Sequence, residues 1–292
     1  MSILKIENLS KSFNDKKVID NLSLTVRENE IYGFIGSNGS GKTTTMNMIL
    51  GQLKPDGGEI YVCGEKVTFG NTKTNKYIGY LPDVPEFYNY MTAEQYLMLC
   101  AQLTDMRKDN RVSRINHLLD IVGLSGNKSK IKSYSRGMKQ RLGVAQALIH
   151  KPELLICDEP TSALDPKGRM ELLKILKDIT SETTVIFSTH VLTDVERISD
   201  HAGILYEGGI VREIDLSKTD FGDKGIHLKL NSNEYNVLSE KLEISPLHGD
   251  DYLAANISLN DLYQVLYEMN IQPSRLELSK KSLEDIYLEV TR

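Results

Sequence analysis

The 292-residue sequence predicts an α/β fold, and three observations carry that prediction. Short apolar stretches typical of buried strands alternate with stretches of helical spacing along much of the chain. One such strand, at residues 31–35, runs directly into a glycine-rich turn and then into a helix. Another, at residues 154–157, ends in two adjacent carboxylates. This alternation of strand and helix implies an α/β core.

The individual elements follow from their residue patterns. Residues 3–9 and 22–26 alternate apolar and polar side chains, as strands with one buried face do. A helix is expected at residues 92–104, because Thr92 and Gln95 form a capping box at its start. Other helices are expected at residues 42–50, 111–122, 138–149 and 163–177, the last begun by Pro166, and another strand at residues 184–188.

The composition changes near residue 214. Residues 215–292 carry 14 acidic and 8 basic side chains, whereas the first 214 residues carry 26 and 27. We therefore expect two domains, 1–214 and 215–292, with a helical subdomain at about 84–150 in the first and a small α+β fold in the second. The elements expected in the second domain are strands at 226–230, 252–258 and 276–278 and helices at 259–269 and 282–290.

Charge and cysteine content narrow the class of protein. A net charge of -5 and a pI near 5.8 do not favour a nucleic-acid partner. Cys63, Cys100 and Cys157 are odd in number and far apart, so they predict neither a disulfide framework nor a metal cluster. We expect a protein of the reducing cytosol.

The sequence contains no expected membrane-spanning or secretory segment. The first nine residues carry Lys5 and Glu7 where a signal peptide would have its apolar core. No stretch approaches the roughly 20 consecutive apolar residues that cross a bilayer. If this protein works at a membrane, another chain is expected to span it.

Residues 36–43 match the phosphate-binding pattern G-x-x-x-x-G-K-[ST] between an expected strand and an expected helix. Glycines let backbone N–H groups point at phosphate oxygens, Lys42 reaches the β and γ phosphates, and Thr43 offers a hydroxyl to Mg²⁺. A chance glycine turn is the alternative, but average residue usage gives this pattern on the order of once per 10⁴ to 10⁵ positions. The expected nucleotide-binding residues are Gly36, Ser37, Asn38, Gly39, Ser40, Gly41, Lys42, Thr43 and Thr44.

Two adjacent acids, Asp158 and Glu159, end the strand at residues 154–157. Because neighbouring side chains diverge along a strand, we expect Asp158 to face Mg²⁺ and Glu159 to face a water aligned with the γ phosphate. Two acids at a strand end are more often solvated loop residues. The phosphate-binding loop in the same chain favours the catalytic interpretation.

A second candidate phosphate site begins at Ser135. Ser135 and the exposed N–H groups beside Gly137 open an amphipathic helix, and such a helix start binds phosphate. The phosphate site at Lys42 is already enclosed by its own loop and does not need this second helix start. The alternative is a capped helix with a solvated basic face, and spacing alone does not separate the two.

Together these motifs resemble the ATP-binding cassette (ABC) ATPases, the nucleotide-binding subunits of transporters. The resemblance covers about residues 2–213 and implies a P-loop NTPase core of ABC type, with an antiparallel β subdomain and a helical subdomain, followed by the small α+β domain. Its parts occur in the family's order: the phosphate-binding loop, the signature stretch at 134–138, Asp158 and Glu159, the stretch at 162–165, and Ser188-Thr189-His190.

The resemblance also implies individual roles. Phe13 would stack on the adenine, His190 would contact the γ phosphate beside the catalytic Glu159 and Lys42, and Asp165 would lie in the loop that links two sites. Ser135 and Gly137 would bind the ATP held by a second copy. Core packing is the alternative for Phe13, and a structural histidine is the alternative for His190.

Two positions depart from the family's usual pattern. The signature reads Ser-Arg-Gly, with Arg136 where Gly is commoner, and the longer string through Arg141 resembles the bacterial branch that exports drugs, antimicrobial peptides or polymers. Asp83 stands where the family usually has a Gln that joins Mg²⁺ and the membrane subunit. Asp83 is therefore a third candidate metal ligand beside Thr43 and Asp158.

The resemblance implies an ATP- and Mg²⁺-dependent ATPase subunit of an exporter. Two copies would form a head-to-tail dimer around ATP and drive a separate polytopic permease from the inner face of the cell membrane, and substrate contacts would belong to that permease. The aromatic cluster Phe87, Tyr88, Tyr90 and Met91 would meet the permease or form local core.

Two other functions are weighed against this one. A soluble cassette ATPase acting on ribosomes or DNA is opposed by the single cassette and by the lack of a long coiled-coil insertion. A nucleotide-sensing regulator is opposed by Glu159 and His190. The stretch at 282–287 resembles the ending of drug-exporter cassettes, which implies dimer support or regulation, or packing alone.

Overall fold

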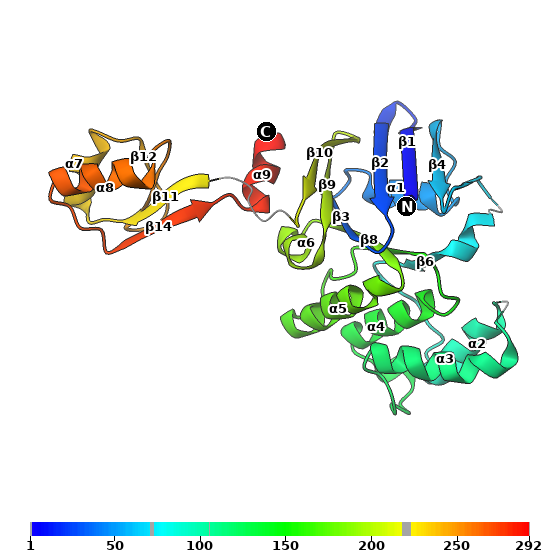
Figure 1. Ribbon diagram of the computed structural model, residues 1–292. Helices are drawn as coiled ribbons and strands as arrows, with labels where there is room; N and C mark the ends of the chain where they lie inside the picture. The colour runs from blue at the N-terminus through cyan, green and yellow to red at the C-terminus, as the bar shows by residue number, and fades with distance from the viewer. Residues whose placement is uncertain (1, 71–72, 105, 218–222, 292) are drawn as a thin grey trace. The chain divides into compact units, whose positions relative to one another are not determined.

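The computed structural model describes residues 2–70, 73–104, 106–217 and 223–291. The chain forms two compact units, Met1–Ser217 and Lys218–Arg292. The α/β core, the antiparallel β subdomain and the helical subdomain lie in the first unit, and the second has an α+β fold (Figure 1). The fold class predicted from the sequence is therefore confirmed.

A six-stranded sheet of order β10-β9-β3-β8-β7-β6 forms the centre of the first unit. β3 pairs in parallel with β8 and β9, and β7 pairs in parallel with β8 and β6. Parallel pairing brings the carboxyl ends of β3, β7 and β8 to one edge, where the candidate site lies. The strands are β3 (Ile31–Ile35), β6 (Ile78–Leu81), β7 (Leu154–Asp158), β8 (Thr184–Thr189), β9 (His201–Tyr206) and β10 (Gly209–Asp215).

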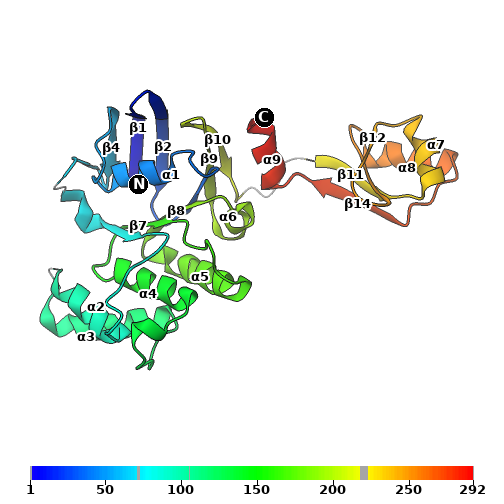
Figure 2. The same ribbon diagram turned by 180° about the vertical axis from the view of Figure 1, so that it is seen from behind.

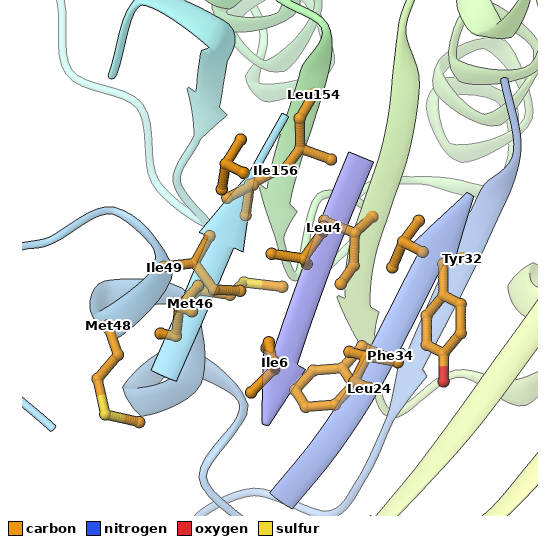
Figure 3. Packing of buried hydrophobic residues seen from close by; sticks show 14 of the residues in the cluster. Leu4, Ile6, Leu24, Tyr32, Phe34, Met46, Met48, Ile49, Leu154 and Ile156 are labelled. Atoms are coloured by element: carbon orange, nitrogen blue, oxygen red, sulfur yellow. The ribbon is translucent and has the colours of Figure 1, made fainter. Parts of the chain in front are cut away.

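A second sheet of the first unit is antiparallel, in the order β2-β1-β4-β5. Alternate side chains of β1 and β2 are buried, as the period of two in the sequence predicts. Leu4 and Ile6 of this sheet lie in one apolar cluster with Met46 and Ile49 of α1 (Lys42–Ile49), and Leu24 lies beside Phe34 in the same cluster (Figure 3). This core fixes the helix that follows the phosphate-binding loop. The strands are β1 (Ser2–Phe13), β2 (Lys16–Arg27), β4 (Gly57–Val62) and β5 (Glu65–Lys66).

The antiparallel sheet and α1 lie on one side of the central sheet, and helices cover the other side (Figures 1 and 2). α4 and α5 lie next to the sheet, and α2 and α3 lie beyond α4. The capping box expected at Thr92 and Gln95 is present at the start of α2. The helices are α2 (Ala93–Gln102), α3 (Lys108–Ile121), α4 (Arg136–Ala147), α5 (Pro166–Asp178) and α6 (Leu192–Ile198), with the 3₁₀ turns η1 (Lys73–Tyr77), η2 (Ile131–Ser133) and η3 (Ile179–Ser181).

The second unit is a four-stranded antiparallel sheet of order β12-β13-β11-β14 with its own apolar core. Ile226 and Leu228 of β11 pack in one cluster with Leu238 of α7 and with Leu262 and Leu266 of α8. A unit with its own core can fold around it. The elements are β11 (Asp223–Lys229), α7 (Ser232–Ser239), β12 (Ile244–Pro246), β13 (Asp251–Ala254), α8 (Leu259–Glu268), β14 (Arg275–Lys280) and α9 (Leu283–Val290).

Membrane spans and disulfides are absent from the part of the chain that the structure describes. Every helix in it is too short or too polar to cross a bilayer. Cys63, Cys100 and Cys157 carry free thiols, as their spacing predicts.

Candidate nucleotide-binding site

The phosphate-binding loop joins the end of β3 to the start of α1. Gly41 is the N-cap of α1 with φ +109°, and Gly39 has φ +81°, a region that side chains rarely adopt. A Cβ on Gly41 would come within 2.5 Å of Ile19 Cδ1. The backbone therefore needs glycine here to wrap around the helix start, where free N–H groups and the helix dipole favour an anion.

Lys42 is folded into its own loop. Its Nζ donates to the carbonyl oxygens of Gly36 at 2.7 Å and Ser37 at 3.1 Å, and it lies 3.1 Å from Glu159 Oε1. The residue is only 5% exposed. Three oxygen partners hold the ammonium in place as a charged group at the mouth of the loop.

Asp158 connects two motifs that lie far apart in the sequence. Its Oδ2 accepts a hydrogen bond from Thr43 Oγ1 at 2.8 Å, and its Oδ1 accepts one from Ser188 Oγ at 2.6 Å. Its carboxylate and the Thr43 hydroxyl thus form a pair of hard oxygen donors, the ligand type that Mg²⁺ prefers. This donor set fits a Mg²⁺ ion bound beside the phosphate loop.

Glu159 points away from Asp158, toward Lys42 and His190. Its Oε2 lies 2.8 Å from His190 Nδ1. The backbone N–H of Glu159 donates to Ser188 Oγ at 2.9 Å, and its φ of +46° is left-handed. A non-glycine residue in this region is strained, and such strain gathers at functional sites.

Tyr80 lies on β6, the strand next to β7. Burial, together with the negative charge of Asp158, raises the pKa of the Tyr80 phenol to about 12. The phenol is therefore neutral at physiological pH. It adds no further negative charge beside Asp158.

Phe13 ends β1 at a turn in which Asn14 adopts a left-handed φ of +51°. Its ring is 45% exposed, with Lys11 Nζ 5.5 Å from the ring centroid. An exposed ring backed by a cation can take a flat ligand on its face. Core packing, the alternative weighed from the sequence, does not describe this side chain.

The helix start expected beside Ser135 is present at α4, and its role as a phosphate site stays a prediction. Ser135 is the N-cap, and its hydroxyl accepts from Met138 N at 3.2 Å. Gly137 follows in the first turn. Among the described residues, no hydrogen bond joins Ser135 or Gly137 to the loop at 36–43 of the same chain.

Asp83 makes contacts away from the other two candidate metal ligands. Its Oδ1 accepts a hydrogen bond from Ser162 Oγ and lies 3.8 Å from Arg136 Nη2. Within the described ranges, no hydrogen bond or ion pair links Asp83 to Thr43 or Asp158. A role for Asp83 as a metal ligand stays a prediction.

The structure reveals a buried network that sequence patterns could not show. Asp194, which is 2% exposed, accepts hydrogen bonds from Thr161 Oγ1 at 2.7 Å and from Arg169 Nε at 2.5 Å. This ties the loop after Glu159 to the start of α5 and to α6. Nearby, Asp165 caps α5 by accepting from Gly168 N at 3.2 Å.

Comparison with known proteins identifies the family. The family described as "ABC transporter" matches residues 19–162. The chain is 37% identical to the uncharacterized ABC transporter ATP-binding protein YxlF of Bacillus subtilis, over 99% of each chain. It is 35% identical to the bacitracin transport ATP-binding protein BcrA of Bacillus licheniformis, over 99% of this chain and 97% of that one. The chain belongs to the ABC transporter ATP-binding proteins.

Solved structures of ABC ATPases share this fold. The cbiO1 subunit from Clostridium perfringens, part of the ABC transporter complex cbiONQ, matches with a TM-score of 0.69 and 25% identity over 75% of this chain and 90% of that one. The ATP-binding cassette MJ0796, a dimer in a post-hydrolysis state with ADP and Pi, matches with a TM-score of 0.64 and 25% identity, over 73% and 98%. As a member of this family, the chain is an ATPase that binds ATP and ADP.

Proposed function

We propose that this ABC ATPase is the energising subunit of an exporter, working with a separate membrane permease. Similarity to two bacitracin transport ATP-binding proteins, at 35% and 33% identity over nearly the whole chain, supports a role in transport. Export as the direction rests on the resemblance of the signature string through Arg141 to the exporting branch. The observation that carries the ATPase part of this proposal is the convergence of Lys42, Thr43, Asp158, Glu159 and His190 at one sheet edge.

In this proposal the loop at 36–43 and Thr44 at the start of α1 surround the phosphates of ATP. Lys42 Nζ exchanges its carbonyl partners for phosphate oxygens, because an ionised oxygen is a stronger partner than a carbonyl. The phosphates also draw it from Glu159, because they carry several negative charges and the carboxylate carries one. Thr43 and Asp158 would hold Mg²⁺. When bound, Mg²⁺ neutralises charge that develops on the phosphates.

Glu159 serves as the group that polarises the attacking water. Release from Lys42 frees one carboxylate oxygen, while His190 holds the other. A carboxylate in this position can accept the proton of the water as it attacks the γ phosphate. His190, which is half exposed, then also reaches the γ phosphate end.

A second copy of the chain completes each site in this proposal. The helix end at Ser135 and Gly137 is not bonded to its own phosphate loop, so it is free to receive the γ phosphate held by a partner's Lys42. Phe13 stacks on the adenine. Hydrolysis removes the γ phosphate that joins the two copies, and the dimer opens.

The permease is expected to dock on the helical subdomain. A groove of about 1070 Å³ there is rimmed by Leu103, which is 82% exposed, and Glu182 is its one acidic lining residue among those described. Opposite charge favours an acidic cytoplasmic segment of the permease as its occupant. The basic and histidine side chains of this groove, here called the basic groove, are Lys76, Arg107, Arg114, His117, His150 and Lys151.

The aromatic cluster divides between the two roles considered for it. Phe87 packs edge-on against Tyr96 of α2 at 5.1 Å, so it belongs to the local core. Tyr88 and Tyr90 are 53% and 68% exposed and lie 5.9 Å apart. We assign these two tyrosines to the permease-facing surface, which would hold the protein at the inner face of the membrane.

The proposal is tested by purifying tagged Glu159→Gln protein from its native cell in mild detergent with ATP and Mg²⁺. A Lys42→Ala protein, which should not retain ATP, is captured in parallel. Recovery of a polytopic membrane protein, enriched in the Glu159→Gln sample, supports the exporter assignment. Recovery with ribosomes, or without any membrane protein, would move the assignment to a non-transport ATPase.

A further inference from the structure

The two positions at which the sequence departs from the usual pattern of ABC ATPases lie side by side. Arg136 Nη2 of α4 is 3.8 Å from Asp83 Oδ1, beyond the end of β6. Both side chains are about half exposed, so the attraction alone is weak. The contact matters because Asp83 is also held by hydrogen bonds from Gln140 and Ser162.

The backbone at Asp83 is anchored to the same helix. Gln140, one turn after Arg136, is fully buried, and its side-chain amide donates to the carbonyl oxygen of Asp83. A buried side-chain amide is costly to leave without partners, so this bond fixes where the residue sits. The carboxylate of Asp83 therefore stays beside the start of α4.

The same carboxylate contacts the loop that carries the catalytic glutamate. Ser162 Oγ donates to Asp83 Oδ1, and Ser162 N donates to the carbonyl oxygen of Glu159 at 3.0 Å. One carboxylate oxygen thus touches both the first residue of α4 and the turn that begins at Glu159. The turn is itself in an unusual conformation, since Glu159 and Ala163 both have a left-handed φ.

We propose that Asp83 is a positioning residue rather than a metal ligand. It ties Arg136, beside the phosphate-binding helix end at Ser135, to Ser162 and so to Glu159 of the same chain. The inference rests on the proposed function, in which the helix end serves one ATP and Glu159 the other. Arg136 gives the Asp83 carboxylate a cationic partner within the protein, so the two departures from the pattern act as a pair.

Steady-state ATP hydrolysis as a function of Mg²⁺ concentration tests this proposal. The variants are Asp83→Asn, Arg136→Gln, their double variant and Ser162→Ala, with Lys139→Gln as a control that removes a charge from the same helix. We expect each single variant to lower kcat about threefold to tenfold with the half-saturating Mg²⁺ concentration unchanged. The double variant should be no slower than the slower single variant, because both substitutions break the same contact between Asp83 and Arg136. The control should match the wild type.

A metal ligand would behave differently. Asp83→Asn would then raise the half-saturating Mg²⁺ concentration by an order of magnitude or more, and Arg136→Gln would not; that result overturns the proposal. Multiplying effects in the double variant, or wild-type rates in all variants, would overturn it as well. The melting temperature of each variant shows whether a loss of hydrolysis comes from misfolding. If the charge variants misfold, the hydrolysis rate of Ser162→Ala, which removes only one hydroxyl, tests the proposal. None of these results depends on the permease, so the exporter assignment is judged separately.

Discussion

Glu159 Oε2 lies 2.8 Å from His190 Nδ1, although the two residues come from different strands. β7 and β8 are parallel neighbours, with Asp158 paired with Ser188, so the residue after each strand emerges at the same sheet edge. The other oxygen of Glu159 faces Lys42 at 3.1 Å. The carboxylate of Glu159 therefore lies between Lys42, which is proposed to bind phosphate, and His190, which holds the carboxylate in place.

Replacing Glu159 by Gln should stop hydrolysis and retain ATP. The amide is nearly the same size but is a far weaker base, so we expect kcat to fall on the order of 100-fold or more. With ATP and Mg²⁺ the variant should elute as a dimer in size-exclusion chromatography. Glu153→Gln, one residue before the same strand, is the matched control and should hydrolyse normally. Hydrolysis by Glu159→Gln at the wild-type rate would contradict the assignment.

Phe13→Ala should weaken ATP binding, whereas Phe13→Tyr should not. An aromatic stack contributes roughly 0.5 to 1.5 kcal/mol, which corresponds to a loss of about twofold to tenfold in affinity. Phe69→Ala removes another exposed phenylalanine of the same unit and should leave the affinity unchanged. Calorimetric titration with ATP distinguishes these cases, and equal affinities for Phe13→Ala and Phe69→Ala would contradict a stacking role for Phe13.

Charge reversal in the basic groove should separate the subunit from its permease. Arg107→Glu puts a carboxylate where we expect an acidic segment to bind, so capture of the permease should fall at least fivefold. Lys108→Glu reverses the next residue, which does not line the groove, and should retain capture. Hydrolysis by the isolated subunit should be the same in both. Undiminished capture by Arg107→Glu would show that the permease docks elsewhere.

His150 should make the folded state less stable in acid. Burial, and next the nearby Arg114, lower the pKa of His150, although its contact with the Ile78 carbonyl opposes this. Since the unfolded chain binds the proton more readily near pH 6.5, stability from this group is present at neutral pH and is lost as pH falls. The difference in urea-unfolding free energy between wild type and His150→Gln should shrink from about pH 7.5 to about pH 5.5. A difference that is constant with pH would refute this.

The sequence predicts the parts of the fold that depend on local pattern. The nearly continuous apolar run of β3 and the glycine-rich loop after it are recognisable because buried parallel strands and phosphate loops need those residues. α7 was missed, although Asn231 and Glu234 form a capping box, because only Leu238 of that helix is buried. β12 was missed because it is three residues long and ends in Pro246.

Contacts between distant residues that no motif connects were beyond what sequence patterns could predict. Thr43 and Asp158 were assigned to one site from separate motifs, and their hydrogen bond places them together. Nothing in the sequence indicates that Asp83 meets Arg136, or that Asp194 holds Arg169, because such pairs are set by how helices pack on the sheet.

The central claim is that each ATP site is shared between two copies of the chain, and a mixing experiment tests it directly. Lys42→Ala removes the phosphate-binding lysine, and Ser135→Asp retains a good helix cap while repelling phosphate, so each variant alone should be inactive. In a head-to-tail dimer of the two variants, one site contains both defects and the other contains none. The account predicts that an equimolar mixture regains hydrolysis, up to about a quarter of the wild-type rate if dimers form at random. A mixture as inactive as its components would contradict it.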